Sequence, residues 1–201
     1  TSCKEIAENR LDVRDNLDCL EIYRRGDDGS IAKCAVLDKS SGWLSEFCDL
    51  DGRELLSQPL RPNFSRAATD NDRGGIDRMI GLMPDWVAFF ITFMGQFVME
   101  YSYWYRWKKV GIDPLIDPVS ECDKLSVVTS TSKEITIKAR TSIMLLKKKI
   151  FDTFVTYEFY GDGSVKVCTL MCPTEAFKRF RISSIPRIGF SFAFRKDLCS
   201  I

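Results

Sequence analysis

The sequence predicts a mainly β, antiparallel fold, a sandwich or barrel, formed by one domain over residues 1–201. Short stretches of alternating apolar and polar residues, or of β-branched residues, recur in the first third and the last part of the chain. Turn sequences such as Tyr160-Gly161-Asp162-Gly163 separate these stretches. A chain of 201 residues is long enough to close a core of about six to nine strands.

Four strands joined by tight turns are expected in the first third of the chain. The expected strands are 17–25, 31–37, 43–50 and 53–57. The turns between them are Asp27-Asp28-Gly29, Ser40-Ser41-Gly42 and Asp51-Gly52, which carry the residues that hairpin turns prefer. Strands at this spacing are typical of a meander in a sandwich or barrel.

A polar loop is expected from Gln58 to Gly75. Pro59 and Pro62 lack the backbone N–H that a sheet ladder uses, so regular pairing is not expected at the start of the loop. The run Asp70-Asn71-Asp72 favours a turn, because short polar side chains bond to the nearby backbone. Gly74 and Gly75 then allow positive φ angles.

The segment 76–110 is expected to leave the sheet as an aromatic-rich helical or loop excursion. Phe89, Phe93 and Phe97 recur every fourth residue, which places them on one helical face. The Tyr and Trp residues at 101–107 suit a buried core or a platform on which sugar rings stack. The candidate stacking residues are Tyr103, Trp104 and Trp107.

Strands are expected to resume after an irregular connector at 112–118. The expected strands are 125–129, 134–140, 151–160, 164–172 and 187–194. The basic run Lys147-Lys148-Lys149 is interpreted as a solvated strand end or turn.

Composition argues against several classes of function. Lys and Arg number 29 and Asp and Glu number 28, so the chain has no basic surplus and no nucleic-acid partner is expected. There is no histidine, which removes the commonest general base and the imidazole metal ligand. The apolar run 87–99 is too short to span a bilayer, so no membrane partner is expected.

The eight cysteines are irregularly spaced. Cys168 and Cys172 have no second pair beside them, so no zinc site is expected. Several lie among apolar residues, which favours buried, reduced cysteines. Their even number also allows disulfides, so the cysteines do not decide the cellular compartment, although the cytoplasm is favoured. The charged segment 1–14 does not resemble a signal peptide.

Several stretches resemble the small-chain domain of β-galactosidases. Three of them follow one another in the order that this family shows: Ser41-Gly42-Trp43-Leu44-Ser45, Gly52-Arg53-Glu54-Leu55-Leu56 and the run from Pro62 to Gly74. The family run is similar to Asn-Phe-(Trp or Thr)-Arg-Ala-Pro-Thr-Asp-Asn-Asp-x-Gly; here Ser65 replaces Trp or Thr and Ala68 replaces Pro. Trp107–Asp113 and Pro186–Phe190 resemble two later family segments.

The resemblance implies an antiparallel β super-sandwich similar to galactose mutarotases, of which this chain forms the N-terminal part. It also implies a large glycoside hydrolase with a separate barrel domain that carries both catalytic Glu residues and binds Mg²⁺ and Na⁺ or K⁺. We therefore expect the chain alone to be inactive and to hold no metal or cofactor. Its expected partners are that barrel domain, or a large subunit, and a galactoside substrate.

In this family the loop helps to shape the galactoside site, and the segment that follows Asp-Asn-Asp-x-Gly can act as a mobile lid. The residues that match it are Arg66, Asp70, Asn71, Asp72, Arg73, Gly74 and Gly75. The residues themselves leave two roles open, because Asp70 and Asp72 suit both contact with sugar hydroxyls and closure of their own turn. The alternative function is a stand-alone carbohydrate-binding or scaffolding β-sandwich. A mutarotase-type enzyme is disfavoured by the lack of histidine.

Overall fold

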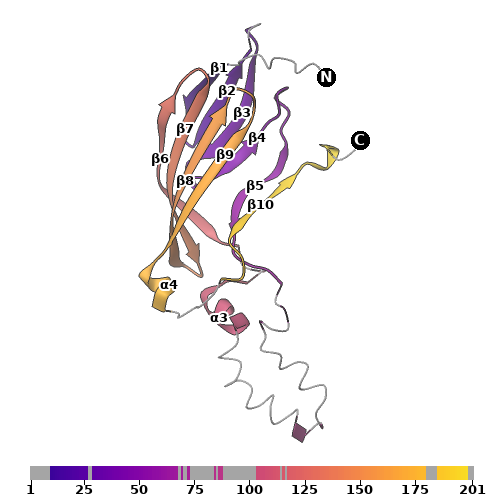
Figure 1. Ribbon diagram of the computed structural model, residues 1–201, viewed down its shortest axis with the longest axis vertical. Coiled ribbons are helices and arrows are strands. Elements are labelled where there is room, and N and C mark those ends of the chain that lie inside the picture. Colours follow the sequence, from indigo (N-terminus) through magenta and orange to yellow (C-terminus); the bar gives the residue numbers. More distant parts are fainter. Residues whose placement is uncertain are drawn as a thin grey trace.

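The computed structural model describes residues 10–26, 29–67, 69, 72, 84, 86–87, 103–113, 115, 117–179 and 185–198. The fold is mainly antiparallel β, which confirms the prediction. The described strands form two four-stranded sheets and one two-stranded ribbon (Figure 1).

The first sheet is an antiparallel meander. Its strands, in spatial and chain order, are β1 (Arg10–Asp15), β2 (Cys19–Arg25), β3 (Ile31–Asp38) and β4 (Leu44–Phe47). Three of the four expected strands thus exist, with shifted ends. β1 was not predicted: its alternation is short, with only Leu11 and Val13 apolar among charged residues, and Leu11 alone is buried.

The second sheet is a longer meander. Its strands are β6 (Val119–Ser130), β7 (Glu134–Leu145), β8 (Lys148–Tyr160) and β9 (Val165–Pro173). Much of β7 and β8 alternates between buried and more exposed residues, as the sequence pattern predicted. β6 begins earlier than predicted, at Val119, with residues that are only partly buried or exposed.

The ribbon pairs β5 (Leu56–Asn63) with β10 (Gly189–Phe194). The expectation of a loop from Gln58 without regular pairing was wrong in part, because β5 extends to Asn63 and Pro62 pairs with Phe190. In this ribbon β5 has a single partner strand, so the ladder tolerates residues without an N–H. The register also shifts between Ser191 and Ala193, beside Pro59, as in a β-bulge.

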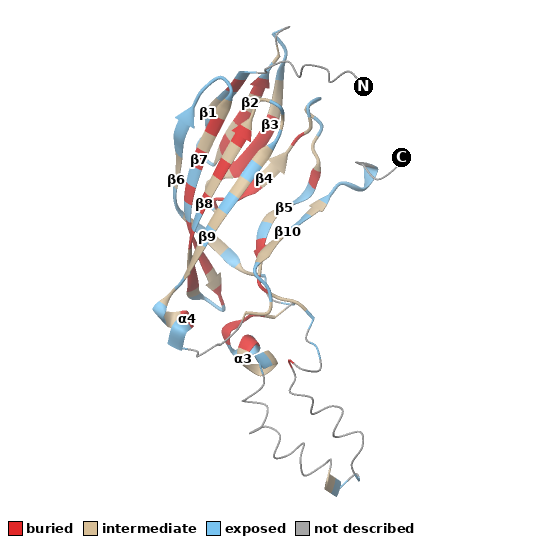
Figure 2. Cartoon of the chain, viewed as in Figure 1, coloured by how far each residue is buried: buried red, intermediate tan, exposed pale blue. Residues whose placement is uncertain are grey.

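The core lies between the two sheets, where Figure 2 shows the buried residues. One continuous cluster joins Leu20, Ile22 and Leu37 of the first sheet to Ile137 and Tyr157 of the second. The buried Tyr157 hydroxyl donates a hydrogen bond to the carbonyl of Gly42, with 3.0 Å between the oxygens. The β3–β4 turn is therefore tied to the opposite sheet.

Two short helices, α3 (Tyr103–Val110) and α4 (Glu175–Arg179), lie at one end of the sandwich, and a 3₁₀ turn (Lys196–Leu198) follows β10 (Figure 1). α3 forms the last part of the predicted excursion 76–110. Phe89, Phe93 and Phe97 lie outside the described residues. Within the described part of the chain, no helix has the length and apolar character needed to cross a membrane.

The turn between β7 and β8 contains two non-glycine residues in the left-handed region: Leu146 has φ 48° and Lys147 has φ 61°. The Lys147–Lys149 run thus spans a turn and the start of a strand, as predicted. We expect Lys147→Gly to raise the free energy of unfolding by about 1 kcal/mol, because glycine adopts this conformation without strain. Urea unfolding measures the change. Lys148→Gly, inside β8, is the control and is expected to destabilise; equal losses in both variants would disprove the strain.

Candidate functional site

The described part of the loop that follows β5, predicted as Gln58–Gly75, centres on an ion pair between Arg66 and Asp72. Arg66 Nη1 lies 2.7 Å from Asp72 Oδ2, and Nη2 donates to Oδ1 at 3.0 Å. Thr69 adds two donors, its backbone N–H and its hydroxyl, each 2.8 Å from Asp72 Oδ2. The two-pronged contact fixes the carboxylate in both distance and orientation. Asp72 thus closes the turn that begins at Thr69.

Asp72 is ionised at neutral pH in this environment. The residue is buried, and burial by itself raises the pKa of a carboxyl group. The hydrogen bonds from Thr69 and Arg66 outweigh this effect and hold the pKa of Asp72 below its usual value. Both carboxylate oxygens are engaged, which supports the turn-closing role. Contact between Asp72 and a sugar stays a prediction.

Arg66 and Asp72 also connect the loop to its surroundings. Arg66 Nε donates to the carbonyl of Pro186, just before β10, at 3.2 Å. The Arg66 guanidinium lies 5.6 Å from the centre of the Trp107 ring in α3. The carbonyl of Asp72 accepts a hydrogen bond from the N–H of Trp104, at the start of α3, at 3.1 Å. The base of the loop is therefore fixed to both α3 and the segment before β10.

The three candidate stacking aromatics all lie on α3 but differ in exposure. Trp107 is 3 % exposed and belongs to the core, which argues against its stacking on a sugar. Tyr103 is 44 % exposed and stacks on Trp107 with 6.3 Å between ring centres. Trp104 is half-buried, with Lys108 Nζ 4.3 Å from its ring centre. Sugar stacking by Tyr103 and Trp104 stays a prediction.

The other predicted loop residues, namely Asp70, Asn71, Arg73, Gly74 and Gly75, lie outside the described residues. Their predicted roles at the galactoside site therefore stay predictions.

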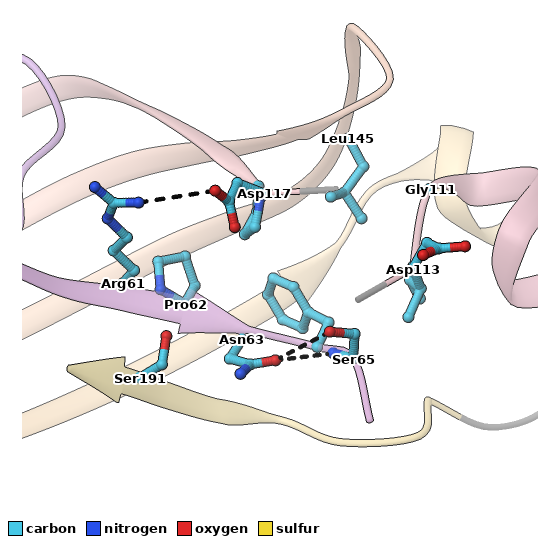
Figure 3. Close-up of a pocket in the computed structure, with 12 residues that line it drawn as sticks. Arg61, Pro62, Asn63, Ser65, Gly111, Asp113, Asp117, Leu145 and Ser191 are labelled. Carbon is cyan, nitrogen blue, oxygen red and sulfur yellow. Dashed lines mark hydrogen bonds and ion pairs between the residues drawn. The ribbon is translucent and has the colours of Figure 1, made fainter. Parts of the chain in front are cut away.

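Sequence reasoning missed a cavity of about 90 Å³ at the start of this loop (Figure 3). Arg61 and Asn63 of β5 line it from one side and Asp113 and Asp117 of the connector after α3 from the other. Arg61 Nη1 lies 3.8 Å from Asp117 Oδ2. No sequence signal joins these segments, because they meet only through the tertiary fold.

The cysteines only partly match their prediction. The six that the structure describes carry free thiols, and Cys34 and Cys48 are buried as expected. Cys168 is exposed, because it alternates to the outer face of β9, which is an edge strand. Among the described residues, no three His, Cys, Asp or Glu side chains gather as metal ligands do. The expectation that the chain holds no metal stays a prediction.

Two packed antiparallel sheets and a ribbon define a β-sandwich domain, and the described residues Arg66, Thr69 and Asp72 form a polar cluster at its edge. The family model "Beta galactosidase small chain" matches residues 31–201. The chain belongs to this family, which confirms the resemblance seen in the sequence.

Curated relatives agree with this assignment. The chain is 27% identical over 158 residues to a β-galactosidase of Priestia megaterium, and the match covers 79% of the chain and 12% of that protein. It is 26% identical over 158 residues to a β-galactosidase of Vibrio cholerae, with 78% and 13% covered. It is 25% identical over 157 residues to one from Lactococcus lactis, also with 78% and 13% covered. The chain thus spans only a small part of the length of these relatives.

Proposed function

We propose that the chain is an accessory domain of a β-galactosidase-type glycoside hydrolase. Its loop 66–75 shapes the wall of a galactoside site, and the catalytic Glu residues lie on a separate barrel domain or large subunit. Family membership and the small share of each relative that the chain covers support this role. Mg²⁺ and Na⁺ or K⁺ belong to the barrel in this proposal, and no catalytic residue is assigned to the chain.

The observation that carries the proposal is the fixed base of the loop. Arg66 and Asp72 hold each other through two N–H···O contacts, and both contact residues of α3. A loop fixed in this way loses less conformational entropy when it binds a ligand, so more of the contact energy appears as affinity. Arg66 and Asp72 are therefore positioning residues.

The loop residues next to this base are the proposed sugar contacts. Asp70, Asn71 and Arg73 supply a carboxylate, an amide and a guanidinium, which together accept from and donate to sugar hydroxyls. Hydrogen bonds to sugar hydroxyls that strengthen in the transition state lower the barrier to glycoside hydrolysis. Gly74 and Gly75 are the proposed hinge of a lid formed by the segment that follows the loop.

The experiment measures hydrolysis of a chromogenic β-galactoside by the chain alone and by the chain assembled with its barrel-bearing partner. We expect no turnover by the chain alone. In the assembled enzyme, Asp70→Asn is expected to lower kcat/KM by about tenfold, because it removes a charged acceptor from the site wall.

The matched control is Asp162→Asn. Asp162 also closes its own turn, since its Oδ1 accepts from the N–H and hydroxyl of Ser164 at 2.8 and 2.7 Å. Its β8–β9 turn lies at the end of the sandwich away from α3 (Figure 1). This variant should retain full activity. Turnover by the chain alone, or equal kcat/KM values for both variants, would refute the proposal.

A further inference from the structure

The C-terminal end of α3 is closed by a capping motif. Gly111 has φ 86°, and its N–H donates to the carbonyl of Lys108 at 3.0 Å. The N–H of Ile112 donates to the carbonyl of Trp107 at 2.9 Å. These two bonds form a Schellman motif, in which a residue in the left-handed region ends the helix and the last carbonyls find donors. Trp107 and Ile112 both belong to the buried core, so the end of the helix is fixed in position.

A strained turn of the second sheet lies against this cap. An added Cβ at Gly111 would lie 2.8 Å from Leu146 Cγ and 3.3 Å from Leu145 Cβ, so the β7–β8 turn covers the glycine (Figure 3). Leu146 is itself in the left-handed region, with φ 48°. Strain of this kind persists where the surrounding structure holds a residue in place, and it is common at functional sites. We call Gly111, Ile112 and Leu146 the α3 anchor.

The same helix holds the base of the loop. Trp107, whose carbonyl accepts from the cap, also has its ring centre 5.6 Å from the Arg66 guanidinium. Near the start of the helix, the N–H of Trp104 donates to the carbonyl of Asp72 at 3.1 Å. The first four N–H groups of a helix have no partner within it, so this bond reports the contact with the loop. α3 has eight residues and is about 12 Å long, so a shift at its anchored end moves both contacts.

We propose that the α3 anchor positions the loop 66–75, with Gly111 and Leu146 as positioning residues for the galactoside site. The inference rests on the proposed function and extends it to residues that lie outside the loop and touch no substrate. Displacement of the cap shifts α3 and, with it, both contacts to the loop. The sugar contacts proposed on the loop then lose their fixed base, so a galactoside binds more weakly.

Two glycines of this chain allow a matched comparison. Gly163, in the β8–β9 turn, has φ 89°, and its added Cβ would lie 2.8 Å from Leu50 Cδ2. Leu50 and Leu146 are 52% and 51% exposed. Gly111→Ala and Gly163→Ala thus introduce similar strain against similar side chains. The β8–β9 turn, however, lies at the end of the sandwich away from α3 (Figure 1).

The first measurement is amide hydrogen exchange of the ¹⁵N-labelled 201-residue chain, followed by NMR. Gly111→Ala is expected to speed exchange at the Trp104 N–H about tenfold relative to the amides of the central strand β7, which report opening of the whole sandwich. Gly163→Ala should leave this ratio unchanged. Leu146→Ala removes the side chain that covers Gly111, and it is expected to speed exchange at Trp104 by a smaller factor.

The second measurement is the KM of the assembled enzyme for a chromogenic β-galactoside. Gly111→Ala is expected to raise KM about three- to tenfold, because binding that is lost equally from the ground state and the transition state appears in KM. Gly163→Ala should leave KM unaltered. A variant that is merely less stable gives fewer active molecules, which lowers the apparent kcat without raising KM.

The proposal is overturned if exchange at Trp104 is the same in Gly111→Ala and Gly163→Ala, or if KM does not rise in Gly111→Ala. Where Gly111→Ala does not fold, Leu146→Ala decides by the same two readings. The exchange measurement needs no catalytic partner and no sugar. Unchanged exchange refutes the anchor, whereas equal turnover in Asp70→Asn and Asp162→Asn refutes the accessory role, so the two failures are distinguishable.

Discussion

Replacing Gly42 with Ala is expected to lower the free energy of unfolding by about 3 kcal/mol, through strain and overpacking together. Gly42 has φ 77°, a left-handed conformation that costs a residue with a Cβ about 1–2 kcal/mol. A Cβ at this position would lie 2.5 Å from Thr141 Cγ2 and 3.1 Å from Cys122 Sγ, inside a packed contact between the sheets. Moving the turn to relieve the clash would also stretch the buried hydrogen bond from Tyr157.

Gly52→Ala separates the two contributions. Gly52 has φ 80°, but its added Cβ would meet only Ala32 Cβ, at an ordinary 3.5 Å. We expect this variant to lose only about 1–2 kcal/mol, the conformational part. Urea unfolding of both variants measures the difference. Equal losses at the two glycines would show that the contact with Thr141 carries no energetic weight.

Gly42 also shows which parts of the fold local sequence can predict. Ser40-Ser41-Gly42 predicted the turn, because hairpin turns draw on a small set of residues. Nothing near Gly42 predicts its contacts with Thr141 and Tyr157, which lie on the opposite sheet. β8 was predictable because its alternation reports which face is buried.

The β5–β10 ribbon is a part of the fold that the local sequence did not predict. Proline argues against a strand only where both strand edges are paired, and the sequence does not say that β5 has one partner. The error at β5 also hid two cavities beside this strand, because Arg61 of β5 lines each of them.

The candidate site was predictable only in part, because local sequence indicates turns but not tertiary contacts. The Asp-Asn-Asp run indicated a turn or a sugar contact, and closure of its own turn by Asp72 was one of the two roles that the residues left open. The burial of Trp107 was not predictable, since helical spacing shows which aromatics share a face but not what covers them. In the fold, that cover includes Arg66, so the same arginine closes the turn and packs on the helix.

The second large effect concerns this ion pair. Arg66→Ala is expected to lower the free energy of unfolding at neutral pH by about 2 kcal/mol, because it leaves the buried Asp72 carboxylate without its cation. This value is below the full cost of breaking a buried pair, since the Arg66 side chain is 37% exposed and water screens the contact. Loss of the packing between Arg66 and Trp107 adds to the effect.

A double-mutant cycle isolates the interaction itself. Arg66→Ala, Asp72→Asn and the double variant are expected to give a coupling energy of about 1–2 kcal/mol. The control cycle uses Arg25 and Asp12, whose side chains are 55% and 60% exposed and 4.0 Å apart at their closest atoms. Its coupling should be close to zero. Similar coupling in the two cycles would contradict a structural role for the loop pair.

Acid is expected to remove the stabilisation that the ionised Asp72 carboxylate gives the folded chain. Its pKa is lower in the folded chain than in the unfolded chain, where a free Asp titrates at about 3.9. The unfolded state therefore binds the proton first, and the stabilisation is fully present above that value and is lost as the pH falls through the folded pKa. We expect the stability gap between the unaltered chain and Asp72→Asn to be constant from neutral pH to about pH 5 and to shrink below pH 4. Urea unfolding across this range measures the gap, and a gap that persists unchanged at pH 2 would mean that Asp72 stabilises the loop without its charge.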